Sequence, residues 1–248
     1  MNVKCEGGGV TSCLSVRLDQ TIKYWKLHGH LPASINSSSQ FQMYRDEAHQ
    51  DVSELIMGKY RPVHDLPFLD YNHGWQYGFY DEVQIEKLSM IAAVVCPLSD
   101  EILDKSHELH NWVKGRTAVL FRGNDKAVEI DATPYNEMIK MAKASGSTSF
   151  VVQTDEQDFF DYFKSVYPDT VAFELPRINR NFSSYAMVDT NKPKFAADFL
   201  AALIALAKCD QLLLNTGNTG LWTCIFRKNI NGVMQYHGQH KQWRKLGE

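Results

Sequence analysis

The chain has 248 residues, of which 44% are hydrophobic and 22% are charged, and its formal net charge is −3. This composition is ordinary for a globular protein in water, and the length allows one large α/β domain or two smaller ones. The small negative charge excludes a global basic field, so we expect neither nucleic acid nor an anionic membrane surface as a partner.

No apolar run is long enough to span a bilayer, and the first residues lack the features of a signal peptide. The sequence therefore predicts a cytoplasmic protein without a membrane span. Five cysteines without Cys-x-x-Cys pairs are typical of reduced thiols. The nine histidines are scattered, and neither His28 with His30 nor His107 with His110 has a third ligand nearby, so a metal site is not expected.

An amphipathic pattern predicts a helix over residues 10–27, followed by a short strand over residues 31–35. Three glycines directly precede this helix. A glycine-rich turn at a helix N-terminus lets an anion approach the free amides, which the helix dipole favours. Gly8 and Gly9 are therefore candidate nucleotide-binding residues. A flexible turn is the alternative, because the segment matches neither the P-loop nor the dinucleotide fingerprint.

Residues 37–81 are polar and hard to assign, and residues 70–80 form the most aromatic stretch of the chain. Rings interleaved with polar groups stack on sugars or bases, but they also cap the edge of a core, and the sequence leaves both interpretations open. Two helices are expected next, over residues 81–93 and 99–113, with Ser99 as the N-cap of the second.

The second half alternates between strand and helix patterns that are joined by short loops. This alternation predicts a parallel, doubly wound sheet. The expected strands cover residues 117–121, 149–153, 170–174 and 211–214, and the expected helices cover residues 134–145, 157–166 and 196–208, with one more after residues 215–220.

Several of these strands end in polar loops, and such loops lie on the same edge of a parallel sheet, where ligands bind. The loop that begins with Arg122 is the most informative. An arginine there presents a planar fork of donors to an anion such as a nucleotide diphosphate, although Arg-Gly-Asn-Asp is also good turn chemistry. Thr154 and Asp155 end a second strand, and residues 215–220 follow another.

Four motifs occur in order: Leu-Phe-Arg-Gly-Asn-Asp-Lys at residues 120–126, Gln-Thr-Asp-Glu at 153–156, Tyr-Pro at 167–168, and the segment 209–219. They resemble the motifs His-Val-Arg-Arg-x-Asp-Lys, Ala-Thr-Asp-Asp, Tyr-Pro and a late Ala-Asp-hydrophobic run in fucosyltransferases of the α-1,6 type. Relatives of these enzymes include the rhizobial chitin-oligosaccharide enzymes and, more distantly, the protein O-fucosyltransferases. Residues 7–9 resemble the family's first glycine-rich loop, so the similarity spans nearly the whole chain.

This resemblance implies a GT-B fold, in which two Rossmann-like halves face each other across a cleft and the C-terminal half is a doubly wound parallel sheet. We expect the acceptor-side half at residues 1–97 and the nucleotide-sugar-binding half at residues 98–248. Family members invert the anomeric centre without a metal, which agrees with the lack of a convincing Asp-x-Asp motif, so no cofactor is expected. The implied partners are a nucleotide-sugar donor and a glycan acceptor.

The resemblance also implies roles for the strand-end residues. Arg122 holds the donor diphosphate and stabilises charge on the departing nucleotide. Asp155 accepts hydrogen bonds from the nucleotide base, with Thr154 beside it. The diphosphate also receives amides and a hydroxyl at a helix N-terminus. These groups come from Gly217, Asn218 and Thr219.

An inverting transfer needs a base that takes the proton of the acceptor hydroxyl. Glu129 is close to the position of an acidic family residue proposed for this role, although a solvated carboxylate is the alternative. Asp70, His73 and Asp81, in or beside the aromatic stretch, are rival bases from the N-terminal half.

Three positions depart from the family pattern. Leu120 replaces a histidine implicated in guanine contacts, Gly123 replaces a second arginine, and Ala202 lies near an expected aspartate. We expect transfer of L-fucose from GDP-fucose to a glycan hydroxyl, with a UDP- or TDP-linked sugar as the alternative donor. A catalytically silent nucleotide- or glycan-binding protein is the alternative from another class, and a kinase is disfavoured because no P-loop is present.

Overall fold

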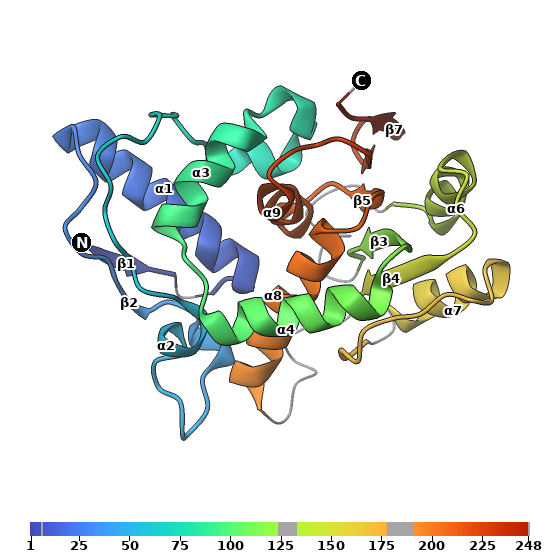
Figure 1. The fold of residues 1–248 in the computed structure, drawn as a ribbon, viewed down its shortest axis with the longest axis horizontal. Coiled ribbons are helices and arrows are strands. Elements are labelled where there is room, and N and C mark those ends of the chain that lie inside the picture. Colours follow the sequence, from blue (N-terminus) through green and yellow to red (C-terminus); the bar gives the residue numbers. More distant parts are fainter. Residues whose placement is uncertain (6, 124–132, 178–190, 248) are drawn as a thin grey trace.

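The computed structural model describes residues 1–5, 7–123, 133–177 and 191–247. The chain folds into an α/β structure around a five-stranded sheet (Figure 1). A second, two-stranded parallel sheet lies in the N-terminal part. Both predicted halves therefore contain parallel strands beside helices, although the N-terminal sheet has only two strands among the described residues.

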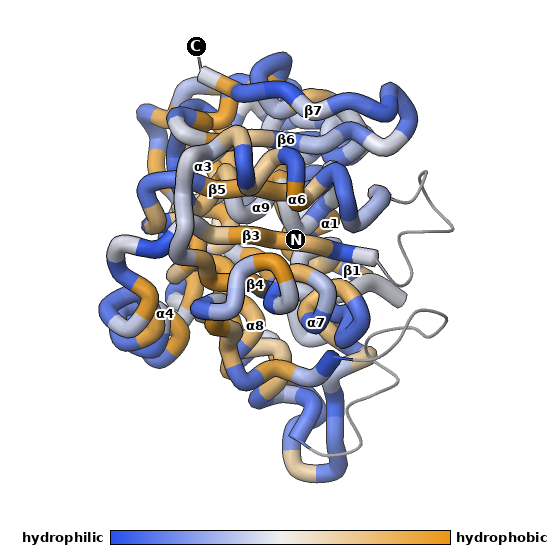
Figure 2. Tube along the Cα trace, turned by 90° about the vertical axis from the view of Figure 1, so that its right-hand side faces the viewer, coloured by the Kyte–Doolittle hydropathy of each residue, from blue (hydrophilic) through white to orange (hydrophobic). Residues whose placement is uncertain are grey.

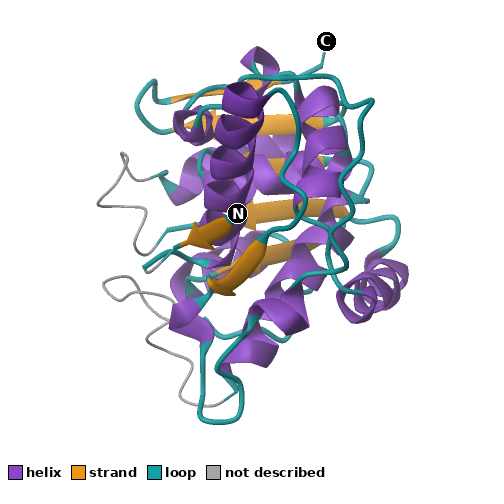
Figure 3. Cartoon of the chain, turned by 90° about the vertical axis from the view of Figure 1, so that its left-hand side faces the viewer, coloured by secondary structure: helices purple, strands orange, loops and turns teal. Residues whose placement is uncertain are grey.

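The N-terminal part is organised by the long helix α1 (Val10–His28), with β1 (Asn2–Lys4) and β2 (Asn36–Ser39) beside it (Figure 3). The predicted strand at residues 31–35 is wrong. Pairing begins only at Asn36, whose N–H donates to the Met1 carbonyl, whereas Pro32 has no N–H to donate. The following elements are η1 (Gln42–Tyr44), α2 (Ser53–Ile56), η2 (His73–Tyr77), η3 (Tyr80–Glu82), α3 (Ile85–Val95) and α4 (Asp100–Val113).

The remaining elements alternate between strand and helix, as predicted. The bounds of β3, β4 and β5 lie within one residue of the predicted strands, because each is a short apolar run with a polar end. In chain order the elements are β3 (Thr117–Phe121), α6 (Tyr135–Ala144), β4 (Phe150–Thr154), α7 (Gln157–Val166), α8 (Lys192–Ala207), β5 (Leu212–Asn215), α9 (Asn218–Arg227), β6 (Val233–His237) and β7 (Gln242–Lys245).

The predicted strand at residues 170–174 is wrong. Val171 pairs with Val151 in an isolated bridge at the edge of the sheet. The Leu175 amide then bonds back to the Phe173 carbonyl, and this tight bend ends the pairing. Two strands that the sequence pattern did not reveal, β6 and β7, extend the sheet on its other side.

The strand order is β4-β3-β5-β6-β7, which Figure 2 shows from the side of α6 and α7. β3 pairs in parallel with β4 on one side and with β5 on the other, β5 pairs in parallel with β6, and β7 closes the edge in antiparallel orientation. The chain thus winds outward from β3 in both directions, which confirms the doubly wound parallel sheet. The winding direction reverses between β3 and β5, the switch point at which such sheets bind ligands.

Alternate side chains of β3 face different helical layers. Ala118 and Leu120 belong to the larger core, together with α4, α8 and α9, whereas Val119 and Phe121 belong to a smaller core with α6 and α7. The larger core continues into α1 and α3. Because the N-terminal part and the main sheet share this core, the start of α1 is held against the start of α9.

Candidate functional site

The carboxyl ends of β3, β4 and β5 meet at one edge of the sheet, as the parallel register predicts. Asn215, the last residue of β5, binds the backbone of Arg122 at both of its amide atoms. Its Oδ1 accepts from the Arg122 N–H at 3.0 Å, and its Nδ2 donates to the Arg122 carbonyl at 2.7 Å. This buried amide fixes where the arginine leaves β3, a role that the sequence analysis did not assign.

Asp155 holds the same loop from the β4 side. Its Oδ1 accepts a hydrogen bond from the Gly123 N–H at 3.0 Å, and its Oδ2 lies 3.4 Å from Nε of Arg122. The carboxylate is buried, and the arginine side chain is 17% exposed. A buried charge needs such a partner, so Asp155 orients the Arg122 guanidinium.

Gly123 is explained by its neighbour Glu156. A Cβ atom at position 123 would lie well inside contact distance of the Glu156 carboxyl group. Glu156 is fully buried, and Oη of Tyr135 donates to its Oε2 at 2.6 Å. The Glu156 N–H is in turn bonded to Oγ1 of Thr154 at 3.1 Å. The absence of a second arginine at position 123 therefore follows from the space that Glu156 occupies.

Gly217 precedes α9 and has a φ of 152°, a conformation that favours glycine. The hydroxyl of Tyr80 accepts from the Gly217 N–H at 3.0 Å and donates to the Gly217 carbonyl at 2.7 Å. Burial raises the pKa of Tyr80 above its usual range, so the phenol stays neutral. Tyr80 thus holds both polar backbone groups of the turn, another role that the sequence analysis missed.

The side chains of Asn218 and Thr219 join α9 to α1. Oδ1 of Asn218 accepts from Ser15 at 2.7 Å, its Nδ2 donates to Ser12 at 3.1 Å, and the hydroxyl of Thr219 lies 3.4 Å from that of Thr11. The first turns of the two helices are therefore side by side. Their first amides have no partners within the helix and carry partial positive charge, so together they favour an anion.

The structure thus brings together most of the predicted nucleotide-binding residues. Gly8 and Gly9 precede α1, Gly217 precedes α9, and the hydroxyls of Thr11 and Thr219 are close across the two helices. Arg122, Thr154 and Asp155 lie at the adjacent strand ends.

The predicted bases lie in different places. Glu129 falls outside the described residues. Asp70 pairs at 2.5 Å with Lys26 near the end of α1, and at 1.5 Å per residue this lies about 25 Å along the helix from Gly9. His73 lies in η2, which packs against α1 and α9, and its Nε2 is 2.8 Å from Nε2 of Gln76.

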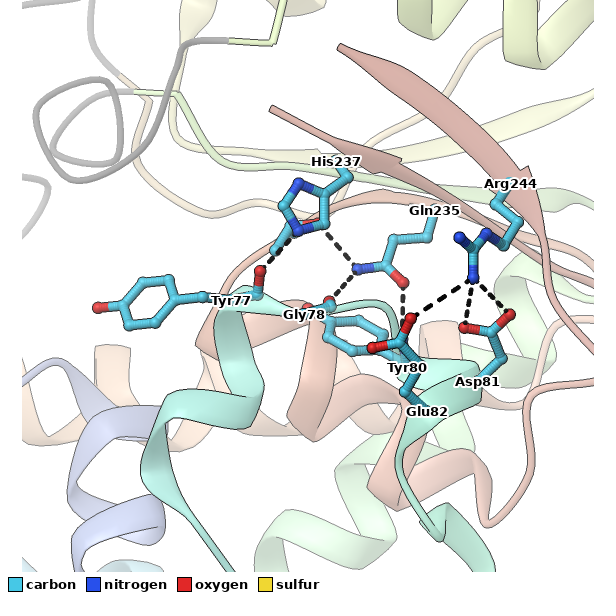
Figure 4. Close-up of polar contacts among 9 residues, drawn as sticks. Tyr77, Gly78, Tyr80, Asp81, Glu82, Gln235, His237 and Arg244 are labelled. Atoms are coloured by element: carbon cyan, nitrogen blue, oxygen red, sulfur yellow. Dashed lines mark hydrogen bonds and ion pairs between the residues drawn. The ribbon is translucent and has the colours of Figure 1, made fainter. Parts of the chain in front are cut away.

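Residues 77–82 pack against β6 and β7, and we call this contact the β6 seam (Figure 4). Gln235 accepts from the Tyr80 N–H at 3.0 Å and donates to the Gly78 carbonyl at 2.9 Å, and Nε2 of His237 lies 2.7 Å from the Tyr77 carbonyl. Asp81 pairs with Arg244 at 3.0 Å. Phe79 and Tyr80 are buried, so this end of the aromatic stretch covers an edge of the core, whereas Tyr77 is 38% exposed.

Across the described segments, no set of three or more His, Cys, Asp or Glu side chains is arranged to hold a metal ion. In those same segments, no helix combines the length and apolar character needed to cross a membrane.

Known solved structures share this fold at low sequence identity. No family profile and no curated protein sequence matches the chain. Among solved structures, the α/β fold with its parallel-dominated sheet matches that of GT-B-like fucosyltransferases, which confirms the predicted fold class. The fucosyltransferase NodZ from Bradyrhizobium aligns with a TM-score of 0.58 and 12% identity, over 99% of this chain and 98% of that one. NodZ α-1,6-fucosyltransferase co-crystallized with GDP aligns with a TM-score of 0.57 and 12% identity, over 98% and 96%.

Proposed function

We propose that the protein is a glycosyltransferase that moves a sugar from a nucleotide-sugar donor to a glycan hydroxyl, with GDP-fucose as the favoured donor. One observation carries this proposal: a partly exposed arginine side chain and two adjoining helix N-termini lie together at the switch point of the sheet. The fold supports it, because a similar fold belongs to an α-1,6-fucosyltransferase that was co-crystallized with GDP.

In this proposal the donor diphosphate lies between Arg122 and the start of α9. Asp155 orients the guanidinium, and Asn215 fixes the backbone from which it extends. The amides of residues 217–219 and the glycine-rich turn at Gly8 and Gly9 supply further positive charge. These groups neutralise the leaving diphosphate, so we propose that no metal is required.

The acceptor hydroxyl attacks the anomeric carbon from the side opposite the diphosphate, which inverts that centre. A base takes the hydroxyl proton. Glu129 and His73 remain candidates for this base, and the packing of η2 against α1 and α9 supports His73. Asp70 is disfavoured, because its position near the end of α1 separates it from the glycine-rich turn by most of that helix.

The direct test is Arg122→Ala, with nucleotide diphosphate release and sugar transfer measured for each donor. We expect turnover to fall by about 100- to 1,000-fold, the usual effect of removing one group that stabilises developing charge. Arg116→Ala is the matched control. Arg116 lies before β3, at the opposite end of the strand, where it binds Ser149 and the Asp169 carbonyl, and its loss should leave turnover near wild type.

Arg122→Ala also leaves the buried Asp155 carboxylate without its guanidinium, which lowers stability. The double variant Arg122→Ala with Asp155→Asn removes that charge and separates folding from catalysis. Thermal melting of all variants verifies the fold. Wild-type turnover in the folded double variant would refute the proposal.

A second candidate function is a nucleotide-binding protein without catalysis, and the replacement of the second arginine by Gly123 favours it. Thermal shifts with GDP, UDP, TDP and their sugars reveal the base preference, because ligands that bind the folded state raise the melting temperature. Saturable binding of a nucleotide sugar without release of its diphosphate would identify the binding protein. Stabilisation by UDP sugars alone would contradict GDP-fucose as the donor, but it would remain consistent with a glycosyltransferase.

A further inference from the structure

Two of the five free cysteines lie together at the start of α1. The thiol of Cys13, in the first turn of the helix, donates to the sulfur of Cys5, and the two Sγ atoms are 3.4 Å apart. Cys13 is buried, whereas Cys5 is partly exposed. A partly exposed cysteine is therefore in direct contact with a buried one.

The surroundings of Cys5 favour its thiolate. The hydrogen bond from Cys13 lowers the pKa of Cys5 to about 7, with help from the backbones of Gly8 and Gly7 and against the effect of burial. Donation to Cys5 and burial raise the pKa of Cys13, so it keeps its proton. The thiolate is the nucleophilic form of cysteine, so Cys5 is the sulfur that attacks and Cys13 the one that resolves.

The three other cysteines have the opposite character. Cys96, Cys209 and Cys224 are buried, and burial raises their pKa values to about 12, 11 and 12, respectively. They remain thiols at neutral pH and are shielded from reagents in the folded protein. The chain therefore contains its own controls for thiol reactivity.

We propose that Cys5 and Cys13 form a peroxide-reactive site that closes into an intramolecular disulfide. The two sulfur atoms are in contact and need only a short approach to bond. Three glycines, Gly7, Gly8 and Gly9, lie between them in the sequence and give the backbone the freedom for this movement. The site does not depend on the proposed transferase activity.

The reaction uses hydrogen peroxide or an organic hydroperoxide as the oxidant. The Cys5 thiolate attacks one peroxide oxygen, the O–O bond breaks, and hydroxide or alkoxide leaves, which oxidises Cys5 to a sulfenic acid. The Cys13 sulfur then attacks the Cys5 sulfur, the S–O bond breaks, and the hydroxyl leaves with the Cys13 proton as water. Two cysteines are oxidised and one peroxide is reduced, and a dithiol reductant reverses the result.

The first experiment measures alkylation of each cysteine by iodoacetamide in the folded full chain at neutral pH, with peptide mass spectrometry as the readout. Cys5 should react at least about tenfold faster than Cys96, Cys209 or Cys224, because only its surroundings stabilise the thiolate. Peroxide treatment followed by peptide mapping without reductant should then give a linked pair of peptides that contain Cys5 and Cys13. Dithiothreitol should separate the pair.

Two variants assign the roles of the sulfurs. In Cys13→Ser the hydroxyl still donates to Cys5, so Cys5 should react with peroxide but stop at a sulfenic acid that dimedone traps. In Cys5→Ser, Cys13 should stay unmodified. Melting curves verify that both variants fold. Equal alkylation of Cys5 and the buried cysteines in the folded protein would overturn the proposal, and so would a peroxide product without the Cys5–Cys13 link.

Discussion

The strand-end site and the β6 seam both bury a side-chain amide, but they use it for different purposes. In the seam, Gln235 binds the backbones of Tyr80 and Gly78 and so closes the contact. In the strand-end site, Asn215 binds the backbone of Arg122, whose side chain stays partly exposed. A buried amide thus joins two segments of the chain in one region and fixes the backbone of an arginine at the strand ends in the other. A partly exposed arginine occurs in both regions, because the Arg244 side chain in the seam is 40% exposed and that of Arg122 is 17% exposed. The difference between the regions therefore lies in the start of α9, which follows β5 beside Arg122.

The largest expected difference between the two regions concerns their glycines. Gly123→Ala forces a methyl group into the Glu156 carboxyl, and we expect it to lower the free energy of unfolding by about 1–3 kcal/mol and to reduce turnover sharply. Gly78→Ala in the seam meets its nearest atom at 3.9 Å, so it should be nearly neutral. Urea unfolding measures both variants.

The double variant Gly123→Ala with Glu156→Ala tests whether the Glu156 carboxyl is the reason that position 123 requires glycine. The double variant should recover part of the lost stability, because the carboxyl no longer occupies the space. If the stability losses of the two single variants simply add in the double variant, contact with the Glu156 carboxyl is not the reason that position 123 requires glycine.

The second largest effects concern the buried side-chain amides of Asn215 and Gln235. Asn215→Ala and Gln235→Ala each remove two or more buried hydrogen bonds, and we expect each to lower the free energy of unfolding by about 1–3 kcal/mol. Asn215→Ala should also reduce kcat/KM, by tenfold or more and by a larger factor than Gln235→Ala, because small misplacements of the arginine that we propose to hold the donor are costly. Donor turnover and thermal melting are measured for both variants. Equal losses of kcat/KM in the two variants would contradict the different roles of the two regions.

Tyr80 connects the two regions, since its N–H belongs to the seam and its hydroxyl holds Gly217. Tyr80→Phe removes the two hydroxyl bonds and leaves the ring in place. We expect a loss of about 1–2 kcal/mol in stability and a severalfold rise in donor KM, because the turn before α9 is no longer fixed. Initial rates at varied donor concentration measure this effect, and an unchanged KM would remove Tyr80 from the description of the site.

The smallest expected effect is a pH dependence in the seam. Burial lowers the pKa of His237 below its usual 6.5, against the effect of its bond to the Tyr77 carbonyl. The unfolded chain then binds the proton more readily, so stability should be complete above pH 6.5 and decline as the pH falls below it. Melting temperatures between pH 7.5 and 5.5 should show less decline in His237→Gln than in the wild type, and parallel curves would contradict this.

The sequence predicted the elements whose signal is local. β3 and α7 have the expected bounds, because a largely apolar run and a strongly amphipathic run each stop at clear boundaries. The strand-end loops followed from the parallel topology, and Arg122 was recognised at the end of its strand. These features depend only on residues close to one another in the chain.

The parts that failed depend on distant partners. β6 contains Gln235 and His237, which look unsuited to a buried strand until residues 77–82 supply the other half of their hydrogen bonds. Likewise, nothing near Asn215 in the sequence indicates that it holds a backbone 93 residues away. Gly123 was recognised as a departure, but its reason, Glu156, lies beyond β4.

The two outer strands of the main sheet bear on how copies of the chain meet at high concentration. On one side, β7 is short and mostly exposed, and Arg244 and Lys245 give it positive charge. On the other side, Val171 occupies part of the hydrogen-bonding edge of β4. Charge and local coverage are the means by which natural sheets discourage strand-to-strand aggregation. The sheet can therefore keep its apolar central strands without offering a long, bare edge to a neighbouring molecule.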